Sequence, residues 1–312
     1  MCCMPRRLML LDSASLYFRA FYGVPDRRAT PDALPNNAIR GFLDMIATLV
    51  TDHRPTELVA CWDNDWRPAF RVEALASYKT HRMVQGTDGV EESPENLTPQ
   101  VPVIVEVLAA IGLTRLGVDG YEADDVIGTL AVGAHGRAQV DVVTGDRDLF
   151  QLVDDAQSVR VLYTAKGGVR APDVVDEAYL ERKYGVASGS AYADMAVLRG
   201  DSSDGLPGVA GIGEKTAATL IGRYGDLASL RAAIDSGDPA LKGAQRTRLE
   251  AASDYLDAAP RVVEVVKDIE LPAAFDPALP VRIADPDTLQ RLTQEHDLRS
   301  PVERVVSALQ LG

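Results

Sequence analysis

The chain has 312 residues, of which 46% are hydrophobic and 25% are charged, and it carries a formal net charge of −14. This length predicts one large domain or a domain with a smaller neighbour, and the composition excludes a disordered or fibrous chain. The three cysteines show no metal-ligand spacing, and no apolar run reaches the length of a signal peptide or membrane span, which indicates a cytoplasmic protein.

Two short apolar runs in the first part of the chain each end in an aspartate. Residues 9–12 end in Asp12, and residues 58–63 end in Asp63. Helical patterns fill the interval between the runs, so we expect neighbouring strands of a parallel sheet with helical crossovers. The carboxyl ends of such strands lie along one edge, which predicts that the two carboxylates are close together.

The segment from about residue 66 to about residue 98 interrupts this pattern. Its first half is basic, with Arg71, Lys79 and Arg82, and its second half is acidic and rich in glycine. A charged helix facing solvent is one interpretation of such a run. The other is a basic arch above the acidic edge of the sheet, with a helical first half and a mobile second half. An apolar helix is predicted over residues 99–111.

Five acidic residues lie at the two ends of the unit formed by residues 121–150. Three fall in the first turn of a predicted helix and two follow a predicted strand: Glu122, Asp124, Asp125, Asp146 and Asp148. Acids in a first helical turn also complement the helix dipole, and Asp-x-Asp is common in turns. Since these residues lie at the edge where the other strands end, and only Arg147 stands among them, we expect a site for hard divalent cations.

A glycine-dense loop over residues 199–216 leads into another predicted helix. A Walker-type phosphate loop is discounted because Glu214 separates Gly213 from Lys215 and no buried strand precedes the loop. Two interpretations stay open. One is a flexible start of a helix. The other is a helix-hairpin-helix element, whose turn presents backbone amides to a phosphate of the nucleic acid backbone.

These motifs, in this order, resemble those of the 5′-nuclease or flap-endonuclease family, in the bacterial form found at the N-terminus of DNA polymerase I. The matching stretches are residues 11–12, 62–63, 71–82, 120–125, 146–149 and 200–217. The resemblance implies an α/β nuclease core of PIN-like fold, with a mostly parallel sheet flanked by helices, over residues 1–184 and including the arch. It implies a helical DNA-binding subdomain over residues 185–312, with a helix-hairpin-helix at about 199–225 and a C-terminal extension.

By this resemblance, nine carboxylates surround at least two divalent cations, Mg²⁺ or Mn²⁺. The first cation would be held by Asp12, Asp63, Glu122 and Asp124. The second would be held, directly or through water, by Asp146, Asp148, Asp201 and Asp204, with Asp125 lying between the two groups. Because this cluster contains much of the acidic excess, the total charge does not exclude a nucleic acid substrate.

The resemblance also implies contacts with DNA. The residues expected in the arch through which a 5′ flap passes are Arg71, Tyr78, Lys79 and Arg82. The residues expected to grip the duplex, with a potassium ion among the loop carbonyls, are Gly208, Gly211, Gly213, Lys215 and Thr216. The residues expected to act in catalysis are Lys79, Arg82, Asp125 and Asp148.

The expected reaction is metal-dependent hydrolysis of DNA phosphodiester bonds near junctions of single strand and duplex. The expected substrates carry 5′ flaps, nicks or 5′ ends, including RNA-primed ends, in replication and repair. Expected partners are a polymerase, a sliding clamp or a ligase, and no membrane. We expect a monomer in the cytoplasm, associated with the nucleoid.

Two features of this sequence depart from the pattern of the nuclease domain found at the N-terminus of DNA polymerase I. Arg147 stands where lysine is more usual, which keeps the charge but changes the geometry of the donors. The sequence shows no polymerase domain before its end at Gly312, so we expect a stand-alone enzyme. Two other hypotheses are a junction-binding protein without catalysis, which the full carboxylate set disfavours, and a small PIN-like RNase, which the arch and the glycine loop disfavour.

Overall fold

The computed structural model describes residues 6–28, 30, 32–87 and 89–311. Cys2 and Cys3 lie outside these residues. Cys61 is a buried free thiol. No helix among the described residues is long and apolar enough to cross a membrane.

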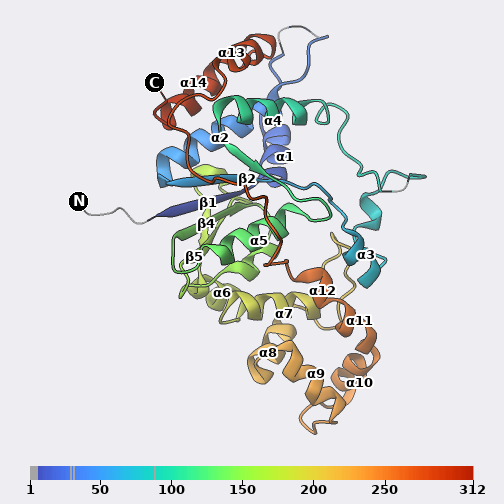
Figure 1. Ribbon diagram of the computed structural model, residues 1–312. Helices are drawn as coiled ribbons and strands as arrows, with labels where there is room; N and C mark the ends of the chain where they lie inside the picture. Colours follow the sequence, from blue (N-terminus) through green and yellow to red (C-terminus); the bar gives the residue numbers. More distant parts are fainter. Residues whose placement is uncertain (1–5, 29, 31, 88, 312) are drawn as a thin grey trace.

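Within the described residues, six strands form one sheet in the order β3-β2-β1-β4-β5-β6 (Figure 1). The strands are β1 (Arg7–Asp12), β2 (Glu57–Cys61), β3 (Thr114–Leu116), β4 (Gln139–Thr144), β5 (Val159–Tyr163) and β6 (Asp173–Val175). Neighbouring strands are parallel except for the antiparallel pair β5 and β6. The predicted α/β fold with a mostly parallel sheet is therefore confirmed.

Some of the helices cover the two faces of this sheet, and others extend beyond it (Figure 1). The helices are α1 (Ser13–Gly23), α2 (Asn37–His53), α3 (Ala69–Ala74), α4 (Gln100–Ile111), α5 (Ala123–Gly133), α6 (Glu177–Tyr184), α7 (Gly189–Arg199), α8 (Glu214–Tyr224), α9 (Leu227–Asp235), α10 (Gly243–Ala251), α11 (Ser253–Ala258), α12 (Pro260–Val263), α13 (Pro286–Glu295) and α14 (Arg299–Ala308). Short 3₁₀ turns are η1 (Thr80–Arg82), η2 (Asp148–Leu152) and η3 (Gly168–Arg170).

The alternation of side chains along β1 separates two hydrophobic cores. Leu8 and Leu10 pack on the face that α5, α6 and α7 cover. Met9 and Leu11 pack on the opposite face, with α1, α2 and α4. Both faces of a central parallel strand are thus buried, which accounts for its continuous run of apolar residues.

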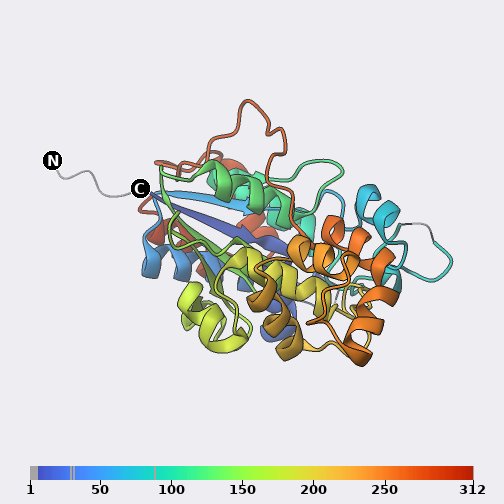
Figure 2. The ribbon, with the colours of Figure 1, turned by 90° about the horizontal axis from the view of Figure 1, so that it is seen from below.

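The helices from α8 to α12 form a smaller unit at one end of the sheet. The first core continues into it through Ile212, Leu220 and Leu249. Figure 2 shows these helices, coloured orange, beside the cyan segment that contains α3, and α3 contacts α12. The unit that we expected to bind DNA therefore borders both the sheet and the arch segment (residues 66–98, of which 88 is not described).

The last two helices return to the α/β core. The domain boundary predicted at residue 185 places α13 and α14 in the helical subdomain. In the structure, α13 packs on α4 and α14 packs on α2 (Figure 1). Leu292, Leu298 and Val305 are buried in the second core. The chain reaches this position by crossing the sheet edge, where the Leu58 amide donates to the carbonyl of Pro277 at 2.8 Å.

The first half of the arch segment is not one continuous helix. Helix α3 ends at Ala74, and Lys79 adopts a left-handed backbone conformation with φ of 49° before η1. The chain turns here because Tyr78 and Lys79 point inward, where both side chains donate to Glu122.

We predict that Val305→Ala lowers the free energy of unfolding by about 2 kcal/mol, because it removes two buried methyl groups and leaves a cavity. Val281→Ala is the matched control, because Val281 is 91% exposed whereas Val305 is fully buried. The control is expected to change the free energy by less than about 0.5 kcal/mol. Urea unfolding measures both, and equal effects would contradict the placement of α14 in the core.

Candidate active site

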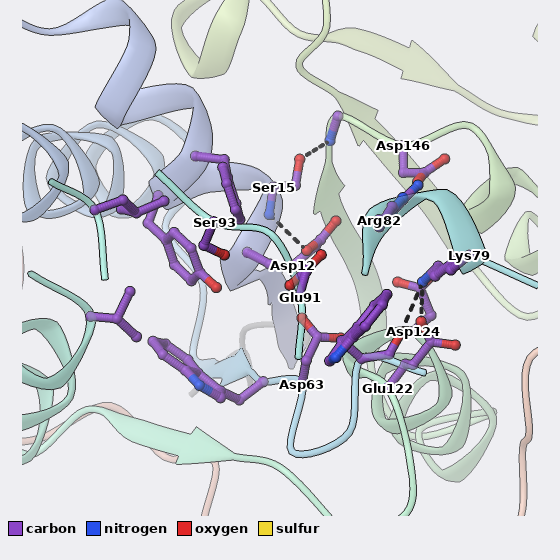
Figure 3. A pocket seen from close by; sticks show the side chains of 18 of the residues that line it. Asp12, Ser15, Asp63, Lys79, Arg82, Glu91, Ser93, Glu122, Asp124 and Asp146 are labelled. Carbon is purple, nitrogen blue, oxygen red and sulfur yellow. Dashed lines mark hydrogen bonds and ion pairs between the residues drawn. The ribbon is translucent and has the colours of Figure 1, made fainter. Parts of the chain in front are cut away.

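A cavity of about 690 Å³ opens where β1, β2 and β4 end. Its acidic lining consists of Asp12, Asp63, Glu91, Glu122, Asp124, Asp146 and Asp201. Figure 3 shows that Asp12, Asp63 and Asp124 are directed toward a common space. The structure therefore brings together carboxylates from distant parts of the sequence, as the strand ends predict.

Asp12 lies at the centre of this cluster. It ends β1 and caps α1, and its Oδ1 accepts from the Ser15 amide at 3.1 Å. Its Oδ2 accepts from the Thr144 hydroxyl at 2.6 Å, which fixes the carboxylate against the end of β4. Burial raises the pKa of Asp12 to about 7, assisted by the negative charges of Asp63 and Asp146 against the opposing effect of these hydrogen bonds.

Asp63 and Asp124 face Asp12 from the other side of the cavity. The Oδ1 of Asp63 accepts from the amide of Ala123 at 2.8 Å, which joins the end of β2 to the start of α5. Asp124 lies in the first turn of α5. Burial, followed by the charges of Asp12 and Asp146, raises the pKa of Asp124 well above its ordinary value. These carboxylates carry like charges in one cavity and therefore repel one another when ionised.

Glu122 lines the cavity, whereas Asp125 faces away from it. The two residues form a capping box at the start of α5, in which the Glu122 amide donates to Asp125 Oδ2 at 3.2 Å. Asp125 is fully buried, and Arg71 donates to both of its oxygens, at 2.6 and 2.7 Å. Asp125 thus has protein donors as its partners in this structure, and its expected place in the metal and catalytic set stays a prediction.

The second expected metal group lies along the loop after β4 and the loop after α7. Asp146 is exposed, and its Oδ1 accepts from the Asp148 amide at 3.0 Å. Asp146 and Asp201 line the cavity, whereas Asp148 and Asp204 are not part of its lining. Burial, followed by the charge of Asp146, raises the pKa of Asp148 well above its ordinary value, with smaller contributions from Asp204 and Asp201. The second group is therefore close enough for mutual repulsion.

Two basic residues of the arch segment stand among these acids. The Lys79 ammonium donates to Glu122 Oε1 (Figure 3). Arg82 Nη2 lies 2.6 Å from Asp204 Oδ1 and also donates to the carbonyl of Ser203 at 2.9 Å. Both residues line the cavity, as the expected catalytic role requires. Their positive charges offset part of the acidic cluster.

Arg71 and Tyr78, which we expected to contact DNA, are buried beneath the cavity. Arg71 is 2% exposed and Tyr78 is 3% exposed. The Tyr78 hydroxyl donates to Glu122 Oε2 at 2.7 Å, and Arg71 Nη1 donates to the same oxygen at 2.6 Å. Neither side chain presents a donor to the surface, so this placement does not fit a direct contact with a phosphate.

The glycine-rich loop joins α7 to α8 in the way a helix-hairpin-helix requires. Gly208 and Gly211 have φ of 65° and 69°, in the left-handed region that favours glycine. A Cβ atom on Gly208 would lie 2.4 Å from the carbonyl oxygen of Arg199, so the close approach of the two chains also excludes a side chain. Gly213 caps α8, and the exposed Lys215 and the half-buried Thr216 follow in its first turn.

Sequence reasoning missed several residues of the cavity. Glu91 comes from the glycine-rich half of the arch segment, which we expected to be mobile, and a bridge between Met83 and Glu91 holds it in place. Tyr17 and Trp62 form an aromatic wall, with ring centroids 5.6 Å apart. Trp62 stands directly before Asp63 in the sequence. Because a residue next to the acid at the end of a strand lies at the same edge of the sheet, the position of Trp62 could have been predicted.

In the described part of the chain, no group of three or more His, Cys, Asp or Glu side chains is already arranged to hold a metal ion. The donor chemistry nevertheless fits hard divalent cations, which prefer carboxylate oxygens. The raised pKa values of Asp12 and Asp124 show that these carboxylates gain from an added positive charge. The residues present therefore fit a divalent cation.

Two family models match consecutive parts of the chain. The first, described as the 5′-3′ exonuclease N-terminal resolvase-like domain, matches residues 7–185. The second, described as the 5′-3′ exonuclease C-terminal SAM fold, matches residues 187–287. The boundary between them falls between α6 and α7.

Curated relatives extend over nearly the whole chain. A 5′-3′ exonuclease of Streptomyces coelicolor is 55% identical over 96% of this chain and 99% of its own length. A 5′-3′ exonuclease of Mycobacterium tuberculosis is 46% identical over 97% of each chain. Among solved structures, the bacteriophage T5 flap endonuclease, in a pseudo-enzyme–product complex with DNA and metal ions, matches with a TM-score of 0.63. It is 18% identical over 98% of this chain and 100% of its own, so this likeness concerns the fold.

We predict a pH-dependent difference in the free energy of unfolding between the metal-free protein and an Asp12→Asn variant. The free energy of the wild type, relative to that of the variant, should fall as pH rises from about 4 to about 7 and then level off. The folded-state pKa of Asp12, about 7, exceeds its ordinary value of 3.8, so the folded state binds the proton more tightly across this window. Urea unfolding at several pH values in a chelator measures the difference. A difference that stays constant or grows with pH would contradict the repulsion described here.

Proposed function

We propose, since the chain belongs to the 5′-3′ exonuclease family, that it cuts DNA near 5′ ends at junctions of single strand and duplex. In this proposal it acts both as a 5′ flap endonuclease and as a 5′-3′ exonuclease. The observation that carries the proposal is the convergence of carboxylates from β1, β2, α5 and the loop after β4 on one cavity, beside Lys79 and Arg82.

The cavity offers two groups of oxygen ligands for Mg²⁺ or Mn²⁺. One cation would be held by Asp12, Asp63, Glu122 and Asp124. The other would be held, directly or through water, by Asp146, Asp148, Asp201 and Asp204. Two divalent cations, when bound, supply activation of water and neutralisation of charge on the scissile phosphate. Thr144 and Ser15 hold the Asp12 carboxylate in a fixed orientation for this purpose.

Lys79 and Arg82 would bind the phosphate that is cut. Both side chains come from the arch segment and line the same cavity as the acids of the strand ends. Cationic donors placed at this point stabilise the charge that develops on the phosphate oxygens. The aromatic wall of Tyr17 and Trp62 lines the same cavity and offers a flat face for an unpaired base.

The loop of residues 208–213 and the first turn of α8 would bind the phosphate backbone of the duplex. The left-handed glycines bring the backbone to the surface, and the first amides of a helix attract anions. Lys215 adds an exposed positive charge beside them. A potassium ion among the carbonyls of this loop is part of the same proposal.

The biological setting follows from the family alone. We place the enzyme in DNA replication and repair, where 5′ flaps, nicks and RNA-primed ends must be removed. A polymerase, a sliding clamp or a ligase would act on the same DNA. We propose that the enzyme works as a monomer in the cytoplasm.

We predict that the protein cuts a labelled double-flap DNA near the flap base in Mg²⁺ or Mn²⁺ and that Asp124→Asn lowers this rate by about 100-fold or more. The substitution removes a charged oxygen ligand from the cavity but no contact to the DNA backbone. Gel analysis of the cleavage products measures the rate, and fluorescence anisotropy in a chelator measures binding, which is expected to persist.

Asp254→Asn is the matched control, because Asp254 is exposed on α11 outside the cavity. This variant is expected to cut at the wild-type rate. Tight junction binding by the wild-type protein, without cleavage in either metal, would make the chain a junction-binding protein instead.

We predict that Lys215→Ala weakens duplex binding and lowers the slope of log Kd against log salt by about one, because one phosphate contact is lost. Lys267→Ala is the control: Lys267 is exposed next to Val266, whose carbonyl accepts from Thr129 of α5, away from the loop. Anisotropy titrations at several salt concentrations measure both variants. An unchanged slope for Lys215→Ala would contradict the assignment of the loop to the duplex.

A further inference from the structure

Arg71 is a buried arginine whose guanidinium joins three segments that are far apart in the sequence. It comes from α3 in the arch segment and is 2% exposed. It donates to Glu122 and Asp125 at the start of α5, at 2.6 to 2.7 Å. Its Nε donates to the carbonyl of Val262, at the end of α12, at 3.1 Å, and Nη2 lies 3.5 Å from the carbonyl of Glu264.

Every N–H group of this guanidinium therefore has an acceptor within the protein. Nε has one acceptor, and Nη1 and Nη2 have two each. The pair with Asp125 is bidentate, which fixes direction as well as distance. An arginine in this state has no donor left for a phosphate, although the family resemblance implied a contact with DNA.

The segment of residues 262–269, named here the strap, also forms hydrogen bonds with this network of buried side chains. The Val266 amide donates to Asp125 Oδ1 at 2.8 Å. Gln151 Nε2 donates to the carbonyl of Val263 at 2.9 Å, and the Val265 amide donates to Gln151 Oε1 at 2.9 Å. The same Gln151 Nε2 also donates to the carbonyl of Asp148 at 2.9 Å, so the strap reaches both acidic groups.

We propose that Arg71 is a positioning residue that holds Glu122 in place for a divalent cation and couples the arch segment and the strap to the cavity. The inference rests on the proposed function, because it assumes that Glu122 is a metal ligand. Glu122 Oε2 accepts from both Arg71 and Tyr78, which leaves Oε1, the oxygen paired with Lys79, on the side of the cavity. Arg71 thereby determines which carboxylate oxygen can reach a cation.

Lysine cannot replace this arginine. Its ammonium is a compact point charge and lacks the planar fork that bridges two carboxylates. Loss of the fork would leave Glu122 and Asp125 as neighbouring buried charges that repel each other. Glu122 would then reorient, and the cation would lose one ligand.

The test is Mn²⁺ binding to the full chain without DNA, measured by calorimetry for the wild type and Arg71→Lys. Loss of a residue that orients a metal ligand typically weakens metal binding by about 10- to 100-fold, and we expect a change in this range. DNA binding in a chelator, and its dependence on salt, are expected to match the wild type. Circular dichroism verifies that the variant is folded.

Arg67→Lys is the matched control, because it is the same substitution in the same segment. Arg67 donates to the carbonyls of Tyr78 and Ala76, at 2.6 and 3.2 Å, and to neither Glu122 nor Asp125. It should keep the wild-type affinity for Mn²⁺. The proposal is overturned if Arg71→Lys binds Mn²⁺ like the wild type, or if it loses DNA affinity with a smaller salt slope, since that is the signature of a phosphate contact.

Modification of the wild-type protein with phenylglyoxal, followed by mass spectrometry, decides the question even if Arg71→Lys does not fold. Arg71 should resist modification with and without flap DNA. Arg82, with a side chain 35% exposed, should react without DNA and be protected with it. Modification of Arg71 in the free protein and its protection by DNA would overturn the proposal. Failure of the wild type to cut DNA would remove the proposed function, while the Mn²⁺ titration would still decide the role of Arg71.

Discussion

The repulsion among carboxylates at one edge of the sheet is the constraint on which the rest of the structure depends. Three parallel strands end in nearly the same register, and Asp12 is paired with Cys61, two residues before Asp63. The first turn of α5 brings Asp124 to the same space. Burial of these like charges raises the pKa values of Asp12 and Asp124. A fold with this edge needs positive charge beside it, from side chains or from bound cations.

The arch segment supplies that positive charge in the metal-free protein. Lys79 pairs with Glu122 and Arg82 with Asp204, while Arg71 lies beneath them. These ion pairs hold the segment against the acids in a series of short turns, with α3 ending at Ala74 and a left-handed backbone at Lys79. Under the proposed function, Lys79 and Arg82 would also be the cations nearest to an incoming phosphate, so charge balance and substrate recognition would use the same side chains.

The sequence allowed the sheet edge to be predicted, because a strand that ends in an acid is a local signal and parallel strands end together. The orientation of Asp125 was not predictable in this way. Asp124 and Asp125 are adjacent in the first turn of α5, and the rotation of the helix against the first core decides which one faces the cavity. Nor could the burial of Arg71 be inferred, because its partners lie 51, 54 and 191 residues away in the sequence. The return of α14 to α2 likewise depends on long-range packing.

The buried connections beneath the cavity bear on how a nuclease can select a junction. The arch segment would meet the single strand and the helical unit would meet the duplex, so only a junction engages both. Arg71 joins the arch segment to the end of α12, and Gln151 joins the strap to the backbone of Asp148. These side chains connect the arch segment and the strap to the acidic residues of the cavity. The geometry of the cavity therefore depends on both the arch segment and the helical unit. Under the proposed function, selectivity therefore arises from a shared rigid base and requires no contact with DNA sequence.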